Sequence, residues 1–210
     1  MGIREGDPVV PRTSFEPMAR KGRYLSKAFD DRVGMAAVVE AGQKLARLKR
    51  SNRVLLAGSV QEEIGLRGAR TLACHAKPDV AVILEGTPAD DTPGFKPDES
   101  QAVVGAGVQI RMHDPSAIMN PRLTELALET AEKEKIPHQL AVRRGGGTDA
   151  GEVHLSGGGV PSVVLGVPAR YIHSHNSIID LADYRAMVDL SVALIRRLTV
   201  RQAAKLVEYL

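Results

Sequence analysis

The chain alternates between two hydrophobic patterns. Short continuous apolar runs, typical of buried strands in a parallel sheet, occupy residues 54–57, 79–84 and 161–167. Residues 103–112 and 139–142 fit two further strands, the first of them antiparallel. Apolar residues recur at helical spacing in four longer segments, 33–48, 66–74, 120–135 and 181–198, and the last is extended or restarted through Leu210. This alternation predicts an α/β protein with a mostly parallel, mixed sheet sandwiched by helices.

The composition is that of an ordinary globular protein. The 210 residues are 43% apolar and 25% charged, enough for one substantial core. The net charge of +3, with Lys and Arg scattered among almost as many acids, argues against nucleic acid as a partner. Cys74 is the single cysteine, so an internal disulfide and a cysteine-built zinc cage are excluded, and we expect it to be buried at a helix end. No run approaches a membrane span and no signal peptide opens the chain, so we expect a cytoplasmic protein without a membrane partner.

Carboxylates follow two of the predicted strands directly. Glu62 and Glu63 come after the run at 54–57, and Glu85 ends the run at 79–84. Open α/β sheets place their ligands at the carboxyl ends of their strands. A lone Glu-Glu pair would more often be a solvated acidic turn, so these residues gain weight only together with others.

Two more candidates complete the pattern. Asp30 and Asp31 stand just before the helix at 33–48, where one aspartate would suffice as an N-cap, and His173 follows the run at 161–167. Several carboxylates with one imidazole suit zinc, cobalt or manganese in a hydrolytic centre better than a structural site. Two metals bridged by one carboxylate would hold both the attacking water and the scissile carbonyl oxygen.

A glycine run at 145–147 leads into Thr148 and Asp149. It lacks the lysine and the spacing of a phosphate-binding P-loop. We expect a tight turn whose backbone approaches a ligand, with Thr148 or Asp149 capping a helix that continues to Leu155.

Five segments together resemble the successive motifs of the tetrahedral (TET) aminopeptidases, metallopeptidase family 42. That family includes glutamyl and deblocking aminopeptidases and proteins once labelled endoglucanases. The five segments are Ala28–Gly34, Gln61–Gly65, Leu84–Thr87, Gly146–Ala150 and Arg170–Ser174. The resemblance implies the dinuclear zinc exopeptidase (phosphorylase/hydrolase-like) fold and hydrolysis of short peptides from their N-termini.

The resemblance also implies a role for each matching residue. Asp30 would bridge two divalent metal ions (Zn, Co or Mn), with Asp31 supporting it. Glu62 would be the catalytic acid or base. The further metal ligands would be Glu63 and His173 for the first ion and Glu85 for the second, where the family more often has Asp. The substrate pocket would be lined by Gly146, Gly147, Thr148 and Asp149.

The chain departs from the family pattern at its N-terminal side. Family members are longer and carry an N-terminal part of the sheet, a His-containing motif for the second metal, and an inserted PDZ-like dimerisation domain. No His precedes Asp30 here. We therefore expect residues 1–20 to be a remnant of the inserted domain, residues 21–210 to be the C-terminal part of the catalytic domain, and the second metal site to be incomplete.

Three functional hypotheses remain open at this point. The first is a metal-dependent aminopeptidase, weakened by truncation and self-associating as a homo-oligomer. The second is a catalytically inactive metal-binding remnant of the family. A glycosidase using Glu62 and Glu85 as paired acids ranks last, because it gives no role to His173 or to the Asp30-Asp31 pair.

Overall fold

A mixed five-stranded sheet forms the centre of the molecule. The computed structural model describes residues 2–96 and 98–208. Strand β7 (Ser162–Ala169) pairs in parallel with β3 (Ala81–Pro88) and antiparallel with β4 (Val108–Asp114). Strand β4 also pairs in parallel with β6 (His138–Val142) and antiparallel with the short β5 (Ala117–Ile118). The predicted mixed sheet is confirmed, and β3 lies at its edge.

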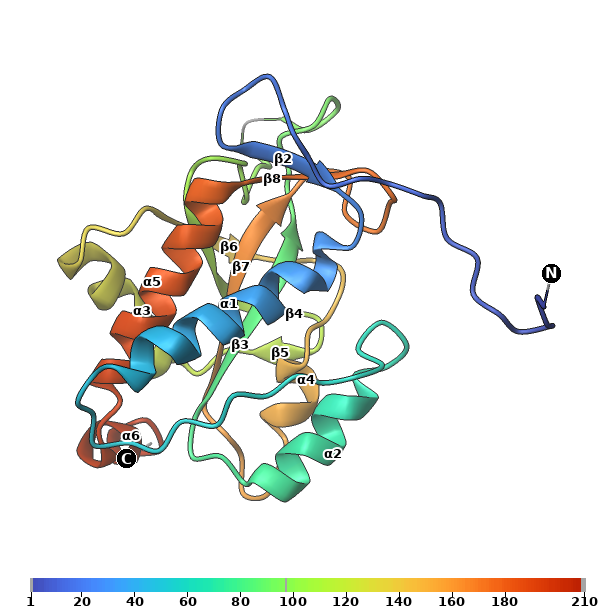
Figure 1. Cartoon of the computed structure of the whole chain (residues 1–210). Helices are drawn as coiled ribbons and strands as arrows, with labels where there is room; N and C mark the ends of the chain where they lie inside the picture. Colours follow the sequence, from blue (N-terminus) through green and yellow to red (C-terminus); the bar gives the residue numbers. More distant parts are fainter. Residues whose placement is uncertain (1, 97, 209–210) are drawn as a thin grey trace.

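A smaller antiparallel sheet covers one end of this body. It has the order β1 (Glu16–Pro17), β2 (Arg23–Ser26) and β8 (Ser177–Asp180). The segment before β1 runs away from the body as an extended arm (Figure 1).

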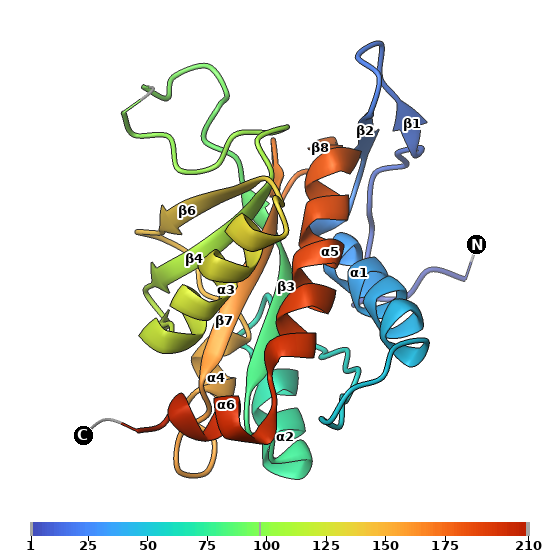
Figure 2. The same cartoon turned by 90° about the vertical axis from the view of Figure 1, so that its left-hand side faces the viewer.

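Helices cover both faces of the large sheet, as Figures 1 and 2 show. Helices α1 (Phe29–Ala46), α3 (Pro121–Lys133) and α5 (Leu181–Arg197) pack on one face, and their apolar sides enclose the main core with β4 and β7. Helices α2 (Arg67–Ala76) and α4 (Ala150–Val153) lie on the other face over a smaller core. The short α6 (Val200–Lys205) restarts the chain after α5. None of the described helices is long and apolar enough to cross a membrane.

Most predicted helices are confirmed, within a few residues at their ends. Helix α3 starts where expected because the Asn120 side chain accepts a hydrogen bond from the Leu123 N–H, the usual N-cap contact. The expected restart after α5 is α6, although residues 209 and 210 lie outside the described part. Helix α4 is shorter than predicted, and Asp149 precedes it without a side-chain capping bond, so the predicted cap is wrong.

The predicted strand at residues 54–57 and the predicted burial of Cys74 are wrong. Residues 54–57 form no strand in the described structure, and Leu55 and Leu56 are 55% and 52% exposed. The run has strand-forming residues, but no strand among the described residues pairs with it. Cys74, expected to be buried, is exposed on α2.

Asp183 ties α5 to the loop before β4. Its side chain is fully buried, and its two carboxylate oxygens accept hydrogen bonds of 2.7 Å from the Gly105 and Gly107 N–H groups. Burial raises the pKa of Asp183 to about 6 despite the Gly105 and Gly107 hydrogen bonds, which lower it; Asp180 contributes to the rise and Arg23 opposes it. The buried carboxyl therefore keeps its proton in the folded protein at pH values where the unfolded chain has lost it.

This predicts a pH-dependent stability. Between about pH 4 and pH 6 the unfolded state binds fewer protons at Asp183 than the native state, so the contribution of this carboxyl to stability falls as the pH rises. Asp183→Asn removes that titration, although its amide can accept only one of the two N–H bonds. The free energy of unfolding, measured by urea titration, is plotted against pH for both proteins across this window. The two plots should have different slopes, and parallel plots would contradict the assignment.

Candidate metal centre

The beginning of α1 is held against the edge strand β3 by one carboxylate. Asp31 Oδ1 accepts hydrogen bonds of 2.9 Å from the N–H of Gly34, in its own helix, and of Gly86, in β3. Asp30 and Asp31, joined by a cis peptide bond, lie at the first turn with non-helical backbone angles. This contact places both aspartates next to Glu85, which lies within β3 rather than beyond its end.

Glu62 and Glu63 lie in the turn that precedes α2. The Glu62 carbonyl oxygen accepts from the Gly65 and Leu66 N–H groups, at 3.1 and 2.9 Å, which closes the turn. The segment before it is tied across the site by a short hydrogen bond from the Ser59 hydroxyl to Asp149 Oδ2. The turn thereby presents its acids toward the start of α1.

His173 approaches from the turn that follows β7. Its Nε2 atom lies 2.9 Å from Asp30 Oδ2 and 3.6 Å from Glu63 Oε2. These three residues come from three separate elements of the chain, so the fold alone brings their ligand atoms together.

The predicted ligands gather into two groups that share Asp30. One is Asp30, Glu63 and His173, and the other is Asp30, Asp31 and Glu85; within each, the candidate ligand atoms all lie within 4.8 Å of one another. An arrangement with one shared carboxylate between two groups fits a pair of bridged cations. The second group contains Asp31, to which the family resemblance gives only a supporting role.

The carboxyl groups raise one another's pKa values. Burial, with a smaller contribution from neighbouring carboxylates, raises the pKa of Asp31 to about 8 and that of Glu62 to about 7. The pKa values of Glu85, Asp30 and Asp149 are also raised, mainly by burial. A divalent cation would offset this repulsion and favour the ionised forms, so the donor set fits such an ion.

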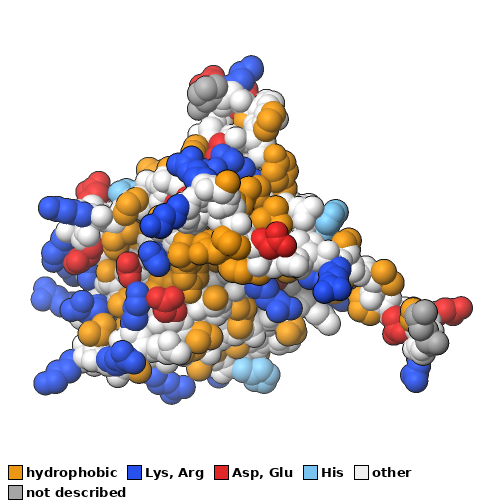
Figure 3. Space-filling model, turned by 45° about the horizontal axis from the view of Figure 1, so that its top comes forward, with side chains coloured by type: hydrophobic (Ala, Val, Ile, Leu, Met, Phe, Trp, Pro, Cys, Tyr) orange, Lys and Arg blue, Asp and Glu red, His pale blue; other side chains and the backbone are white. Residues whose placement is uncertain are grey.

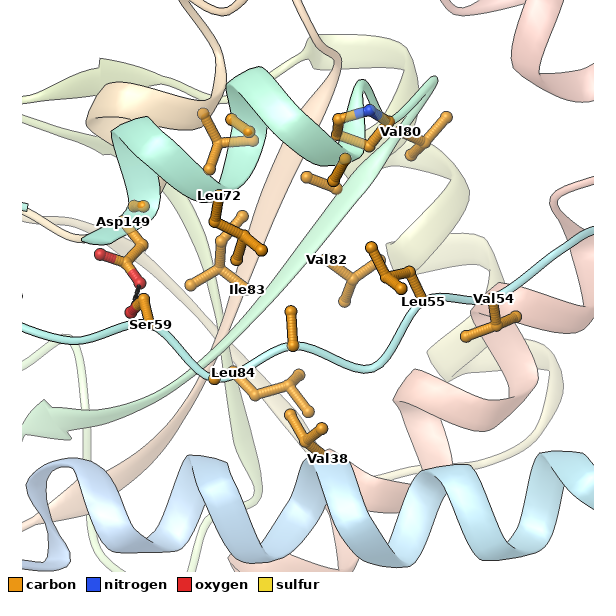
Figure 4. A pocket seen from close by; sticks show the side chains of 18 of the residues that line it. Val38, Val54, Leu55, Ser59, Leu72, Val80, Val82, Ile83, Leu84 and Asp149 are labelled. Carbon is orange, nitrogen blue, oxygen red and sulfur yellow. Dashed lines mark hydrogen bonds between the residues drawn. The ribbon is translucent and has the colours of Figure 1, made fainter. Parts of the chain in front are cut away.

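All of these acids line one end of a single cavity of about 760 Å³. Much of the remaining wall is apolar and comes from α1, β3, α2 and residues 54–57, as Figure 4 shows with the Ser59–Asp149 hydrogen bond, and the lining also includes the charged side chains of Arg32, Arg53, Lys77 and Asp79. An acidic end beside an apolar wall can hold a cation and a partly apolar molecule together.

The predicted substrate-binding turn is only partly in this cavity. Asp149 lines it, whereas Thr148 is buried and hydrogen bonds to Ser116 and Asp114. Gly146 and Gly147 are exposed and outside the cavity lining. Ser59 is a contributor that the sequence did not indicate, since a single serine after a glycine carries no distinguishing pattern.

Comparison with known proteins decides the family. The family model described as M42 glutamyl aminopeptidase matches residues 1–190. The chain belongs to the M42 family. This confirms the resemblance drawn from the five motifs, and M42 relatives carry names of peptide-hydrolysing enzymes.

Three M42 relatives show the extent of the likeness. Glutamyl aminopeptidase of Lactococcus lactis is 36% identical over 208 residues, which are 99% of this chain and 57% of the relative. The structure of a TET aminopeptidase from a marine sediment archaeon of the Thaumarchaeota matches with a TM-score of 0.93 and 40% identity, covering 98% of this chain and 58% of that one. The TET1 peptidase of Pyrococcus horikoshii, which can assemble into a tetrahedron or a large octahedral shell, matches with a TM-score of 0.77 and 32% identity, over 89% and 54% of the two chains.

These matches confirm the fold class. They also show that the chain spans about half the length of the M42 relatives it matches. The division into a remnant at residues 1–20 and a catalytic part at 21–210 stays a prediction.

The close approach of α1 to β3 generates a test. A methyl group at Gly34 would collide with the Asp31 carboxylate and the Leu84 carbonyl oxygen. We expect Gly34→Ala to lower the free energy of unfolding by about 1–3 kcal/mol in urea titration, because neither neighbour can move without breaking the contact.

Gly42→Ala, in the same helix, is the matched control. Its methyl group would meet only the end of the exposed Leu56 side chain, which can rotate away. Stability should therefore stay unchanged or rise by up to about 1 kcal/mol. Equal effects of the two substitutions would contradict the role given to Gly34.

Proposed function

We propose that this chain carries the metal-binding and catalytic residues of a metal-dependent aminopeptidase. The observation that carries the proposal is the pair of ligand groups sharing Asp30, with Glu62 beside both and belonging to neither. Zinc, cobalt and manganese are the ions that suit carboxylates combined with an imidazole. Asp30, Glu63 and His173 would hold one of them, and Asp30, Asp31 and Glu85 the other.

Glu62 is suited to move the proton in peptide hydrolysis. A divalent metal bound in the centre would act as a Lewis acid on the scissile carbonyl group. Glu62, with a pKa raised to about 7, can accept a proton from the attacking water and then give it to the leaving amine. Asp149, held by Ser59, would face the bound peptide from a position near Glu62.

The two groups differ in their donors, and this supports unequal affinities. The first contains the His173 imidazole, whereas the second, among the described residues, contains carboxylates alone. Carboxylate oxygens favour harder ions such as magnesium or manganese. We therefore propose one tight site, a weaker second site and low peptidase activity; an inactive metal-binding chain is the alternative.

Peptides from which single N-terminal residues are removed are the proposed substrates. The names of the Lactococcus and Thaumarchaeota relatives support this, and the assembly of the Pyrococcus peptidase supports a homo-oligomer. A cytoplasmic location stays a prediction from the sequence. A glycosidase is disfavoured because His173 contacts Asp30 and Glu63, a contact that paired-acid chemistry does not use.

His173 tests the first metal site. We expect His173→Ala to remove most of the tightly bound zinc. Of the two carboxylates that remain, Glu63 is exposed and Asp30 is shared with the second group. Metal content measured by mass spectrometry after dialysis checks this. His175→Ala, an exposed histidine two residues away and outside both groups, is the control and should keep wild-type content. Wild-type zinc in the His173 variant would refute the ligand.

Glu62 tests the catalytic assignment. We expect Glu62→Gln to lower hydrolysis of aminoacyl chromogenic substrates by about 10²–10⁴-fold, because an amide cannot accept the proton. Its metal content should equal that of the wild type, because Glu62 belongs to neither ligand group. An active variant, or one that loses its metal, is incompatible with this role.

A further inference from the structure

The loop that carries His173 is short and open to solvent. It joins β7 to β8 through residues 170–176, at the end of the body that is uppermost in Figure 1. Figure 3 turns this end toward the viewer and shows Lys and Arg side chains beside apolar ones. The His173 side chain is 64% exposed, and its described polar contacts are with Asp30 and Glu63, at the candidate metal site itself. Because packing confines this side chain so little, neighbouring residues must hold it in place.

The backbone of this loop adopts conformations that side chains disfavour. Tyr171 and His173 have φ values of 54° and 61°, in the left-handed region that is uncommon for residues other than glycine. Such conformations persist where the surrounding structure imposes them. Inside the loop, the Ser174 hydroxyl donates to the Tyr171 carbonyl oxygen at 2.6 Å, which closes the turn. This bond sets the shape of the turn but not its direction relative to the sheet.

Arg170 fixes the point at which the loop leaves the sheet. Its backbone N–H and carbonyl pair with Ile178 at 2.9 and 3.1 Å, and its carbonyl oxygen also accepts from the Ser177 hydroxyl. Its guanidinium group donates two hydrogen bonds to Asp91, from Nε to Oδ1 at 2.8 Å and from Nη2 to Oδ2 at 2.7 Å. A bidentate pair of this kind fixes an orientation as well as a distance. Arg170 is therefore held by both its backbone and its side chain.

Asp91 lies just beyond the end of β3. Its Oδ2 atom also accepts from the Val104 N–H at 3.1 Å. Burial raises the pKa of Asp91, but the hydrogen bonds from Arg170 and Val104 outweigh burial and hold the pKa below its usual value. The carboxylate is thus ionised at neutral pH. The pair links the His173 loop to the strand that contributes Glu85.

We propose that the Arg170–Asp91 ion pair positions His173 to bind the first metal ion. The histidine stands three residues beyond this fixed point, on a backbone closed into a turn, and its Nε2 atom lies 2.9 Å from Asp30. A ligand that is already oriented loses less conformational freedom on binding, so metal affinity should depend on the pair. The inference rests on the proposed function, in which His173 is a metal ligand.

The preceding residue provides a matched control. Asp90 forms the same kind of pair with Arg143, whose two terminal nitrogens donate to the carboxylate at 2.6 and 3.1 Å. The Asp90–Arg143 pair is the more buried of the two, so its loss should cost the fold at least as much. Arg143 follows β6 and leads into the glycine turn, which contributes no residue to either ligand group. A merely structural role would therefore give both pairs the same effect.

Zinc affinity tests the proposal. The full 210-residue protein is stripped of metal with a chelator and titrated with zinc against a competing indicator dye. Arg170→Gln should weaken the tight site by about tenfold or more, as is typical when a residue that orients a metal ligand is replaced. Arg143→Gln should keep the wild-type affinity. Arg170→Lys retains the charge without the bidentate geometry and should fall between Arg170→Gln and the wild type.

A double substitution tests whether the two members of the pair act together. Asp91→Asn should weaken zinc binding as Arg170→Gln does, and the double variant should bind no more weakly than the weaker single variant. Fully additive losses would mean that the two residues act independently, which would overturn the assignment.

Motion of the loop provides a readout that needs no metal. In the metal-free Arg170→Gln variant, backbone NMR order parameters across residues 171–176 should fall below about 0.6, whereas Arg143→Gln should match the wild type. Unchanged order parameters, or equal losses of zinc affinity in the Arg170 and Arg143 variants, would overturn the proposal. A wild-type chain that binds no zinc would refute the proposed function instead, and the order parameters would then decide the positioning role alone.

Discussion

The fold and the candidate centre both depend on the carboxylate of Asp31. By accepting from the N–H groups of Gly34 and Gly86, it fixes the first turn of α1 on β3. The approach is so close that a side chain at either glycine would press on the neighbouring backbone; at Gly86 it would lie 3.2 Å from the Asp30 Cα. Because α1 also packs on α5 and the main core, this one contact links the hydrophobic interior to the position of the acids.

The clustered carboxyl groups of the centre lower the stability of the folded state, and the rest of the fold must offset this. Burial raises the pKa values of five carboxyl groups around the cavity, and repulsion from neighbouring carboxylates adds to the rise at Asp30, Asp31, Glu62 and Glu85. Such a cluster is unfavourable for stability on its own and becomes favourable when a cation binds, since ligands that bind only the folded state stabilise it. His173, whose Nε2 contacts Asp30, provides a small part of that compensation within the protein.

The hydrophobic pattern predicted correctly those elements that pair or pack with other described elements of this chain. Residues 162–169 form a strand because β3 and β4 flank them, and α3 begins at its Asn120 cap. The same apolar pattern failed at residues 54–57, because strand formation also needs a partner, which no single segment encodes. The ligand candidates were found from motifs, whereas the hydrogen bond between Ser59 and Asp149 joins residues 90 positions apart and leaves no local signal.

The edge position of β3, near the exposed and extended Leu55 and Leu56, has a consequence for aggregation. Two strand-forming segments exposed together form a template for uncontrolled self-assembly into cross-β aggregates. Arg53 and Asp79 stand at the beginnings of the two apolar segments, as gatekeeper charges do in natural sequences. The apolar stretch from Val80 to Leu84 carries no such charge. Where these two segments stay exposed, the charges of Arg53 and Asp79 are therefore the main protection against such pairing.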